Sequence, residues 1–134
     1  EWNWQIDPLG FRDVLNKMYQ RYQIPVFPIE NGIGVQEEWD GVNPIEDDYR
    51  ILYLKEHIRE MKKAVLQDGV YLIGYTPWGC IDCISFTTGE MKKRYGFIYV
   101  DREEFDLKTL DRYRKDSFYW YKKVIATNGS DLSD

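Results

Sequence analysis

The residues with the clearest chemical potential lie in one basic stretch, residues 85–97, which reads SFTTGEMKKRYGF. It places hydroxyl side chains, two glycines and three consecutive cations in a chain whose formal net charge is -5 at pH 7. Ammonium and hydroxyl groups donate charge-assisted hydrogen bonds to anions, so the stretch raises the question of what it binds. A solvated turn is the ordinary alternative for a run of charges. We expect that alternative for Lys92, and an ion pair for Arg94.

Two cysteines, Cys80 and Cys83, have the C-x-x-C spacing of a redox pair or of half a metal site. A zinc site needs about four ligands, whereas the single histidine, His57, lies far away in sequence. A thioredoxin-like pair opens a helix directly after a strand, but Pro77 and Gly79 precede this one. We therefore expect structural thiols, no metal and no cofactor. A thiol-redox protein remains as a rival, and its mark would be a strongly depressed thiol pKa.

Two further candidates, Glu30 and Trp78, follow apolar segments that are expected to be strands. Functional groups of parallel α/β folds lie at the carboxyl ends of the strands, which is where both residues fall. A carboxylate at the end of a buried strand costs desolvation unless it has partners, and sites that tolerate this cost are often catalytic. The alternatives are a loop glutamate that caps a helix or forms a salt bridge, and a tryptophan of the core.

Three helices must position these residues. Asp7-Pro8 is a helix start, with a capping oxygen and a proline at the first helical position, and predicts a helix to Tyr22. A long helix over about 47–67 ends before Gly69, and a last helix runs from about 116 to Asn128-Gly129. The apolar stripe of the first helix is predicted to be Phe11, Val14, Met18 and Tyr22, and that of the last to include Phe118, Tyr121 and Ile125.

The apolar runs 26–29 and 70–76 predict two strands, the first of them buried on both faces as parallel strands are. Residues 32–45 are rich in Gly, Asn and Pro and predict a loop, while 95–101 predicts an additional strand. Strands that alternate with helices indicate a parallel α/β architecture, although two main strands cannot close a sheet.

Composition limits the class of protein. The chain has 134 residues, 43% hydrophobic and 16% aromatic, which suits one folded segment. Its acidic balance argues against sequence-independent binding of nucleic acid, which draws on many Lys and Arg contacts to phosphates. No run approaches the ~18 apolar residues of a membrane span, and no signal-peptide pattern is present, so we expect a cytoplasmic protein without a membrane partner. The start at Glu1, followed by Trp2 and Trp4, is typical of the middle of a larger protein.

The order of motifs resembles the C-terminal portion of the 6-phospho-β-glucosidases of glycoside hydrolase family 1. The resemblance covers almost the whole chain and rests on WQIDPLGFRDVLNKMYQRY, YQIPVF, IENG, GYTPWGCIDC and KKRYGFIYVD. It implies a segment of a (β/α)8 TIM barrel comprising helix 6, strand 7, helix 7, strand 8 and helix 8. Residues 1–134 would then be a single segment and not a complete catalytic domain, since such a barrel needs about 250 residues.

The resemblance implies that Glu30 is the catalytic nucleophile, at the end of barrel strand seven. Strand eight would be residues 70–76, and Trp78 would match the family tryptophan that lines the sugar pocket. Retaining hydrolysis also needs a second carboxyl group as acid and base. In this family it belongs to an Asn-Glu-Pro motif on strand four, and the 134 residues contain no such tripeptide.

The basic stretch acquires a role through the same resemblance. Unphosphorylated members carry a Glu-Trp pair in the loop after strand eight, which is absent between Ile84 and Gly89. The 6-phospho-glycosidases instead have a hydroxyl residue and then Lys-x-Tyr around the sugar 6-phosphate. Lys93 and Tyr95 match that pattern, and either Ser85 or Thr87 would supply the hydroxyl.

The expected function is therefore retaining hydrolysis of 6-phospho-β-glucosides by a full-length parent enzyme. Its substrate would be a phosphorylated disaccharide or an aryl-glucoside, and the isolated chain is expected to be inactive. The alternative is a non-catalytic fragment or phospho-sugar-binding module, with self-association to cover exposed strand edges. Galactoside preference stays open, because 6-phospho-galactosidases tend to have a tryptophan in the phosphate loop, where this chain has only the aromatic Phe86.

Overall fold

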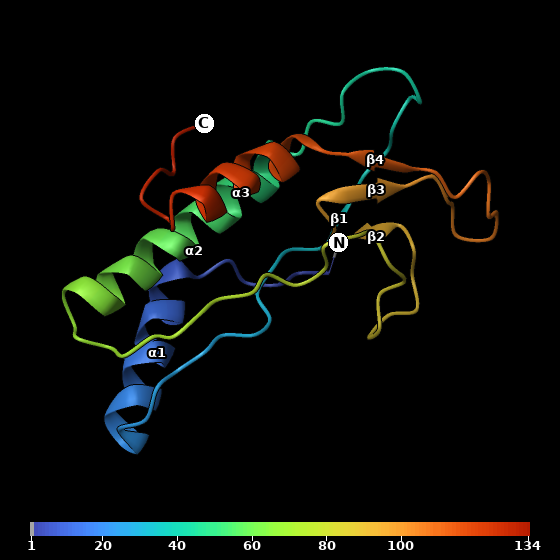
Figure 1. Cartoon of the computed structure of the whole chain (residues 1–134). Helices are drawn as coiled ribbons and strands as arrows, with labels where there is room; N and C mark the ends of the chain where they lie inside the picture. The colour runs from blue at the N-terminus through green and yellow to red at the C-terminus, as the bar shows by residue number, and fades with distance from the viewer. Residues whose placement is uncertain (1) are drawn as a thin grey trace.

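The computed structural model describes residues 2–134 and contains, over that range, three helices and two small antiparallel sheets. The helices lie together at one end of the molecule and the sheets at the other (Figure 1). The helices are α1 (Pro8–Tyr22), α2 (Asp48–Leu66) and α3 (Asp116–Ala126); the strands are β1 (Val35–Gln36), β2 (Lys93–Arg94), β3 (Ile98–Val100) and β4 (Arg112–Arg114). The three predicted helices are confirmed to within about two residues at each end.

Helix α1 begins where its capping residues predict. The Asp7 side chain accepts a hydrogen bond from the Gly10 amide at 2.8 Å, and Pro8 occupies the first helical position. The predicted apolar stripe is wrong in most of its members, since the buried residue of the helix is Leu15, which packs against Ala64 and Val70. The members left half exposed are Val14, Met18 and Tyr22.

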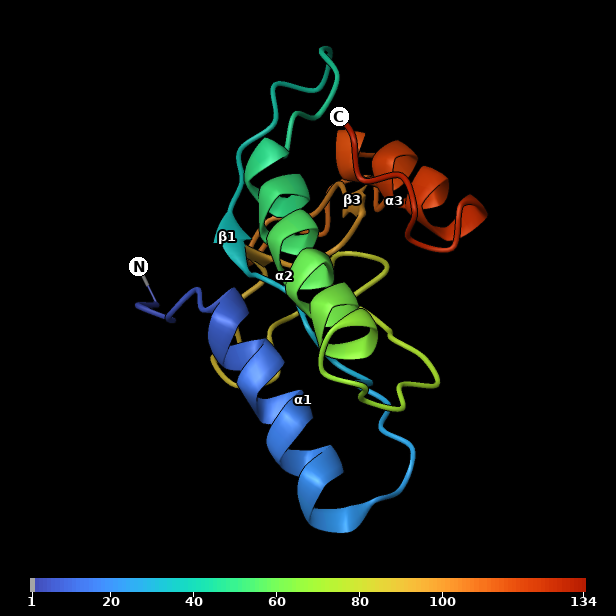
Figure 2. The same ribbon diagram turned by 90° about the vertical axis from the view of Figure 1, so that its left-hand side faces the viewer.

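Helices α2 and α3 lie side by side and enclose the main core (Figure 2). Leu54 and Ile58 of α2 are 1% and 2% exposed and belong to one cluster with Trp120 and Val124 of α3. Two members of the stripe predicted for α3, Phe118 and Tyr121, pack against this cluster, whereas the third, Ile125, is 65% exposed. Burial of large apolar side chains between these helices supplies the stability on which the site rests.

The segments 26–29 and 70–76 lie parallel, as predicted, but they form no regular strands. One bridge joins Val26 to Leu72, and the Ile73 amide donates to the Val26 carbonyl at 3.0 Å. The burial on both faces that was predicted for 26–29 is also wrong, because Phe27 is 45% exposed and Ile29 is 71% exposed. Within residues 2–134 no other strand pairs with these segments, so neither has the two flanking neighbours that bury a strand of a parallel sheet.

The two sheets correct the prediction for the rest of the chain. Strand β1 lies inside the expected loop 32–45 and pairs with β2, matching Val35 to Arg94 and Gln36 to Lys93. The expected strand 95–101 is interrupted at Gly96, whose amide donates to the Asp82 carboxylate at 2.8 Å. Only Ile98–Val100 continues as β3, which pairs with the unanticipated β4.

No helix in the part of the chain that the structure describes is long and apolar enough to cross a membrane.

Candidate active site

Glu30 stands at the end of the extended segment 26–29, between two hydrogen bonds that join its neighbours in the chain to Thr76 and Trp78. The Thr76 hydroxyl donates to the Ile29 carbonyl at 2.6 Å, and the Trp78 amide donates to the Asn31 carbonyl at 2.8 Å. The Glu30 side chain is exposed and makes no hydrogen bond or ion pair with residues 2–134. The hydrogen bonds of its neighbours fix its backbone while its carboxylate stays available.

The carboxylate opens on a cavity of about 350 Å³ in which Glu30 is the sole acidic residue among the described lining. Sequence-predicted residues from three separate segments meet here. The side chains that line the cavity include Glu30, Trp78, Thr87, Tyr95, Tyr53 and Trp4. Aromatic walls with a few convergent polar groups are typical of a small-ligand site, and Glu30 and Trp78 both line this one.

Asn31, next to Glu30, is held by two tyrosines. Its amide nitrogen donates to the Tyr53 hydroxyl at 3.1 Å, and the Tyr75 hydroxyl donates to its side-chain oxygen at 2.8 Å. Burial raises the pKa of both tyrosines, so both hydroxyls keep their protons at neutral pH. The rigid amide fixes the chain direction directly after the carboxylate.

Lys93 is the least satisfied polar residue near the cavity. Its side chain is 1% exposed, and its ammonium finds no hydrogen-bond acceptor among residues 2–134. Ser85, which is also buried, places its hydroxyl 3.3 Å from the Tyr95 hydroxyl and 3.5 Å from the Thr87 hydroxyl. A buried ammonium is costly without a partner, so this group of donors favours an anion.

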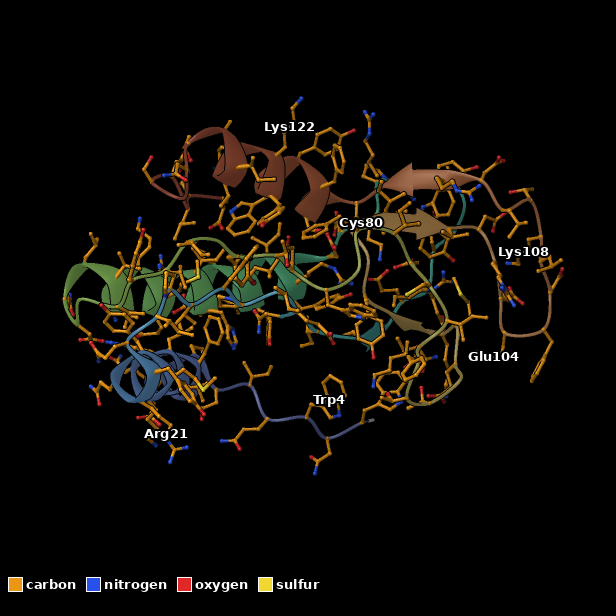
Figure 3. All side chains as sticks on the ribbon, turned by 60° about the horizontal axis from the view of Figure 1, so that its bottom comes forward. Trp4, Arg21, Cys80, Glu104, Lys108 and Lys122 are labelled. Atoms are coloured by element: carbon orange, nitrogen blue, oxygen red, sulfur yellow. The ribbon has the colours of Figure 1, made fainter. Side chains whose placement is uncertain are left out.

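Two tryptophans that sequence reasoning did not assign to the site cover the Lys93 ammonium. The ammonium lies 4.1 Å from the ring centroid of Trp4, 4.9 Å from that of Trp2 and 5.6 Å from that of Tyr95. Trp2 is anchored by its indole N–H, which donates to Glu90 at 2.9 Å. Cation–π contacts of this kind partly replace missing hydrogen bonds. The signal in the sequence that could have assigned these two residues to the site is their Trp-x-Trp spacing. Figure 3 shows Trp4 on the side of the molecule opposite Lys122.

Close backbone approach sets the positions of Lys93 and Tyr95. A Cβ on Gly34 would lie 2.7 Å from the Tyr95 ring and 2.9 Å from Cγ of Lys93, so only glycine fits there. Glu104, which Figure 3 labels, accepts hydrogen bonds from the Met91 and Lys92 amides at 2.8 and 3.2 Å. These contacts hold the basic stretch from both sides.

Unlike Lys93, its neighbours Lys92 and Arg94 each lie close to a carboxylate among residues 2–134. The predicted ion pair of Arg94 is confirmed, because its guanidinium lies 3.4 Å from the Asp82 carboxylate, where both side chains are buried. Lys92, expected in a solvated turn, is partly exposed and lies 3.3 Å from Glu90.

The cysteines show no sign of redox chemistry. Both thiols are free, and burial raises the pKa of Cys83, the opposite of the depression that a reactive thiol requires. Within residues 2–134 no three His, Cys, Asp or Glu side chains are grouped to hold a metal ion.

Comparison with known proteins gives one consistent result. Residues 1–130 match the sequence profile described as "Glycosyl hydrolase family 1". The chain is 58% identical to the 6-phospho-β-glucosidase AscB of Escherichia coli and to the aryl-phospho-β-D-glucosidase BglA of Bacillus subtilis, over 98% of its own length. It spans only 28% of the length of each.

A solved structure agrees. The family 1 β-glucosidase of Thermotoga maritima superposes with a TM-score of 0.84 at 36% identity, covering 96% of this chain and 28% of the enzyme. The interrupted parallel segments and the small sheets therefore reproduce a part of that larger α/β enzyme.

Proposed function

The chain belongs to glycosyl hydrolase family 1, and from this premise we propose that it supplies the nucleophile and the phosphate-binding loop of a retaining 6-phospho-β-glucosidase. In this proposal α1, α2 and α3 are helices 6, 7 and 8 of a (β/α)8 barrel. The parallel segments 26–29 and 70–76 are its strands 7 and 8. The names of its relatives, 6-phospho-β-glucosidase and phospho-cellobiase, support this choice of substrate class.

The observation that carries the proposal is the Lys93 ammonium, which is buried without a hydrogen-bond acceptor among residues 2–134. It lies 5.6 Å from the ring centroid of Tyr95, whose hydroxyl is 3.3 Å from that of Ser85. A sugar 6-phosphate offers oxygens that accept from all three groups. Either Ser85 or Thr87 serves as the first hydroxyl, and the complete burial of Ser85 favours that residue. Trp78 and Tyr95, whose ring centroids lie 6.3 Å apart, form the wall against which the sugar ring packs.

The chemistry assigned to Glu30 is attack on the anomeric carbon. An exposed carboxylate without a cation or donor to hold it, on a backbone fixed at both sides, suits a nucleophile. The displaced oxygen leaves with a proton from a second carboxyl group, roughly 5–5.5 Å away in retaining enzymes, and water later hydrolyses the glycosyl ester. The cavity has no second carboxylate from the described residues. The acid must come from outside this segment, so the isolated chain is inactive in this account.

A second candidate function is supported by that same absence of a second carboxylate. By itself the chain would bind a phosphorylated sugar through Lys93 without hydrolysing it. Binding of glucose 6-phosphate by the 134-residue chain, lost in Lys93→Ala, would favour this module function if no larger protein carrying the chain hydrolyses glycosides.

The test uses a hybrid enzyme in which these 134 residues replace the matching segment of the 58% identical Escherichia coli relative. We expect hydrolysis of a chromogenic 6-phospho-β-glucoside, reduced by about three orders of magnitude or more in Glu30→Gln. The matched control is Glu38→Gln, another exposed glutamate, which should leave turnover unchanged. A Glu30→Gln hybrid that retains a tenth of the activity would reject the assignment.

A further inference from the structure

We propose that Arg50 is a positioning residue that fixes the distance between the catalytic carboxylate and the phosphate-binding lysine. The inference rests on the proposed function. It concerns a buried side chain of α2 that is not part of the cavity lining.

The backbones that carry the two functional groups run side by side. Glu30 leads within five residues into β1, and β1 pairs with β2, which contains Lys93. The ladder has only two residue pairs, Val35 with Arg94 and Gln36 with Lys93. So short a pairing cannot by itself define the spacing of the segments that leave it.

Arg50 joins those segments where the ladder ends. One terminal nitrogen of its guanidinium donates to the Ile33 carbonyl at 2.9 Å and to the Tyr95 carbonyl at 2.7 Å. The other donates to the Arg94 carbonyl at 3.3 Å. A planar fork with five donors can bridge two strands in this way, and an ammonium cannot. Figure 2 shows β1 beside the N-terminal half of α2. Arg50 belongs to the first turn of that helix.

A buried charge network holds the guanidinium in that orientation. Arg50 lies 2.9 Å from Asp47 and 2.7 Å from Glu37, and Lys115 bonds Glu37 at 2.5 Å. Three cations balance three carboxylates, and all are buried or nearly so; the network consists of Arg50, Lys115, Arg94, Asp47, Glu37 and Asp82. The Tyr49 hydroxyl completes it, accepting from Arg50 at 2.7 Å and donating to Glu37.

The consequence for catalysis is specific to phosphorylated substrates. Such a substrate is anchored at Lys93 and attacked by Glu30, so its anomeric carbon is placed by the spacing of the two segments. An unphosphorylated glucoside lacks the anchor and depends much less on that spacing. Loss of the Arg50 bridge should lower kcat for the phosphorylated substrate while leaving its KM nearly unchanged, because Lys93 still binds the phosphate.

The experiment compares Arg50→Lys, Lys93→Ala and the unsubstituted protein in the hybrid enzyme, with chromogenic β-glucosides that carry or lack the 6-phosphate. For Arg50→Lys we expect kcat on the phosphorylated substrate to fall about tenfold or more, with KM and the unphosphorylated reaction changed less than about threefold. Arg59→Lys is the matched control, since Arg59 lies on the same helix and its ion pair within residues 2–134 is with Glu56 at the surface. Tyr49→Phe, which removes one bond to the guanidinium, should give the same pattern more weakly.

Equal losses on both substrates for Arg50→Lys, or a raised KM in place of a lowered kcat, would overturn the inference. If Arg50→Lys does not fold, the test passes to Tyr49→Phe. Equal losses of activity on the two substrates in that variant would also reject the inference. Failure of the proposed function is distinguishable, since Lys93→Ala would then spare the preference for the phosphorylated substrate. That result would remove the basis of the inference as well.

Discussion

Replacing Lys93 by methionine separates a binding role from a structural one. The substitution keeps the length of the side chain and removes the ammonium, which is buried without a hydrogen-bond acceptor among residues 2–134. A structural lysine would stabilise the fold, so its loss would destabilise the protein. A lysine whose acceptor is a bound ligand leaves its buried ammonium unsatisfied in the free protein. Its replacement should therefore be neutral or stabilising.

The magnitude follows from the contacts of the ammonium. An unsatisfied buried polar group costs about 1–3 kcal/mol. The three aromatic rings around Lys93 offset about 0.5–2 kcal/mol of that cost. Lys93→Met should therefore change the free energy of unfolding by between about −1 and about +2.5 kcal/mol, with a Tm rise of up to roughly 8 °C for a chain of this size. Losing a charge-assisted bond to phosphate costs about 1.5–3 kcal/mol, or roughly 10- to 150-fold in KM.

Two assays check the predicted changes in stability and in KM. Thermal and urea unfolding of the 134-residue chain, followed by circular dichroism, gives the stability change. Kinetics of the hybrid enzyme on a chromogenic 6-phospho-β-glucoside gives the change in KM. The control is Lys92→Met, a partly exposed neighbour whose loss should change stability by less than about 0.5 kcal/mol and leave KM unaltered. A Lys93→Met chain that is destabilised by more than about 1 kcal/mol, with an unchanged KM in the hybrid, would refute the reasoning.

Three further predictions concern the surroundings of the site. Gly34→Ala should push the Tyr95 ring and the Lys93 stem apart, at roughly 1–3 kcal/mol of overpacking, and raise KM for the phosphorylated substrate in the hybrid about tenfold; an unchanged KM would contradict it. The Arg12 side chain lowers the pKa of Asp68 from 3.8 to about 2, so the stability from this pair is complete above about pH 4 and is lost between about pH 4 and 2. Asp68→Asn should abolish that part of the pH dependence in acid unfolding. The isolated chain should show no hydrolysis of 6-phospho-β-glucosides, and turnover by purified chain would show that a second carboxylate lies within it.

The sequence predicted the helices well because their ends are local. The start of α1 is marked by the capping pair Asp7-Pro8. The ends of α2 and α3 are marked by Gly69 and by Asn128-Gly129, which adopt the left-handed backbone conformation. None of these signals depends on distant residues. Which face of a helix is buried depends on its neighbours. That is why Leu15 replaced the expected stripe of α1.

Strand ends marked Glu30 and Trp78 in the candidate site, and the family resemblance added Thr87 and Tyr95. Glu30, Trp78, Thr87 and Tyr95 line one cavity, although they come from segments up to 65 positions apart. The strands themselves were overestimated, since their regularity depends on neighbours that residues 2–134 do not provide.

The parts that sequence reasoning missed are long-range and polar. Arg50 meets the Arg94 and Tyr95 carbonyls across 44 and 45 positions, and Lys115 meets Glu37 across 78. A sequence does not distinguish buried charged residues from exposed ones, so no periodic pattern predicts such a network.

The most direct measurement identifies the residue that becomes covalently attached to the sugar. A 6-phospho-β-glucoside with fluorine at C2 and a good leaving group slows hydrolysis of the glycosyl ester more than its formation, because fluorine destabilises the oxocarbenium-like transition state. The hybrid enzyme is treated with this compound, digested and mapped by mass spectrometry. We predict one added 6-phospho-2-fluoroglucosyl group on the peptide that contains Glu30, and none in the Glu30→Gln protein. A label on any other residue would contradict the assignment of Glu30 as the nucleophile.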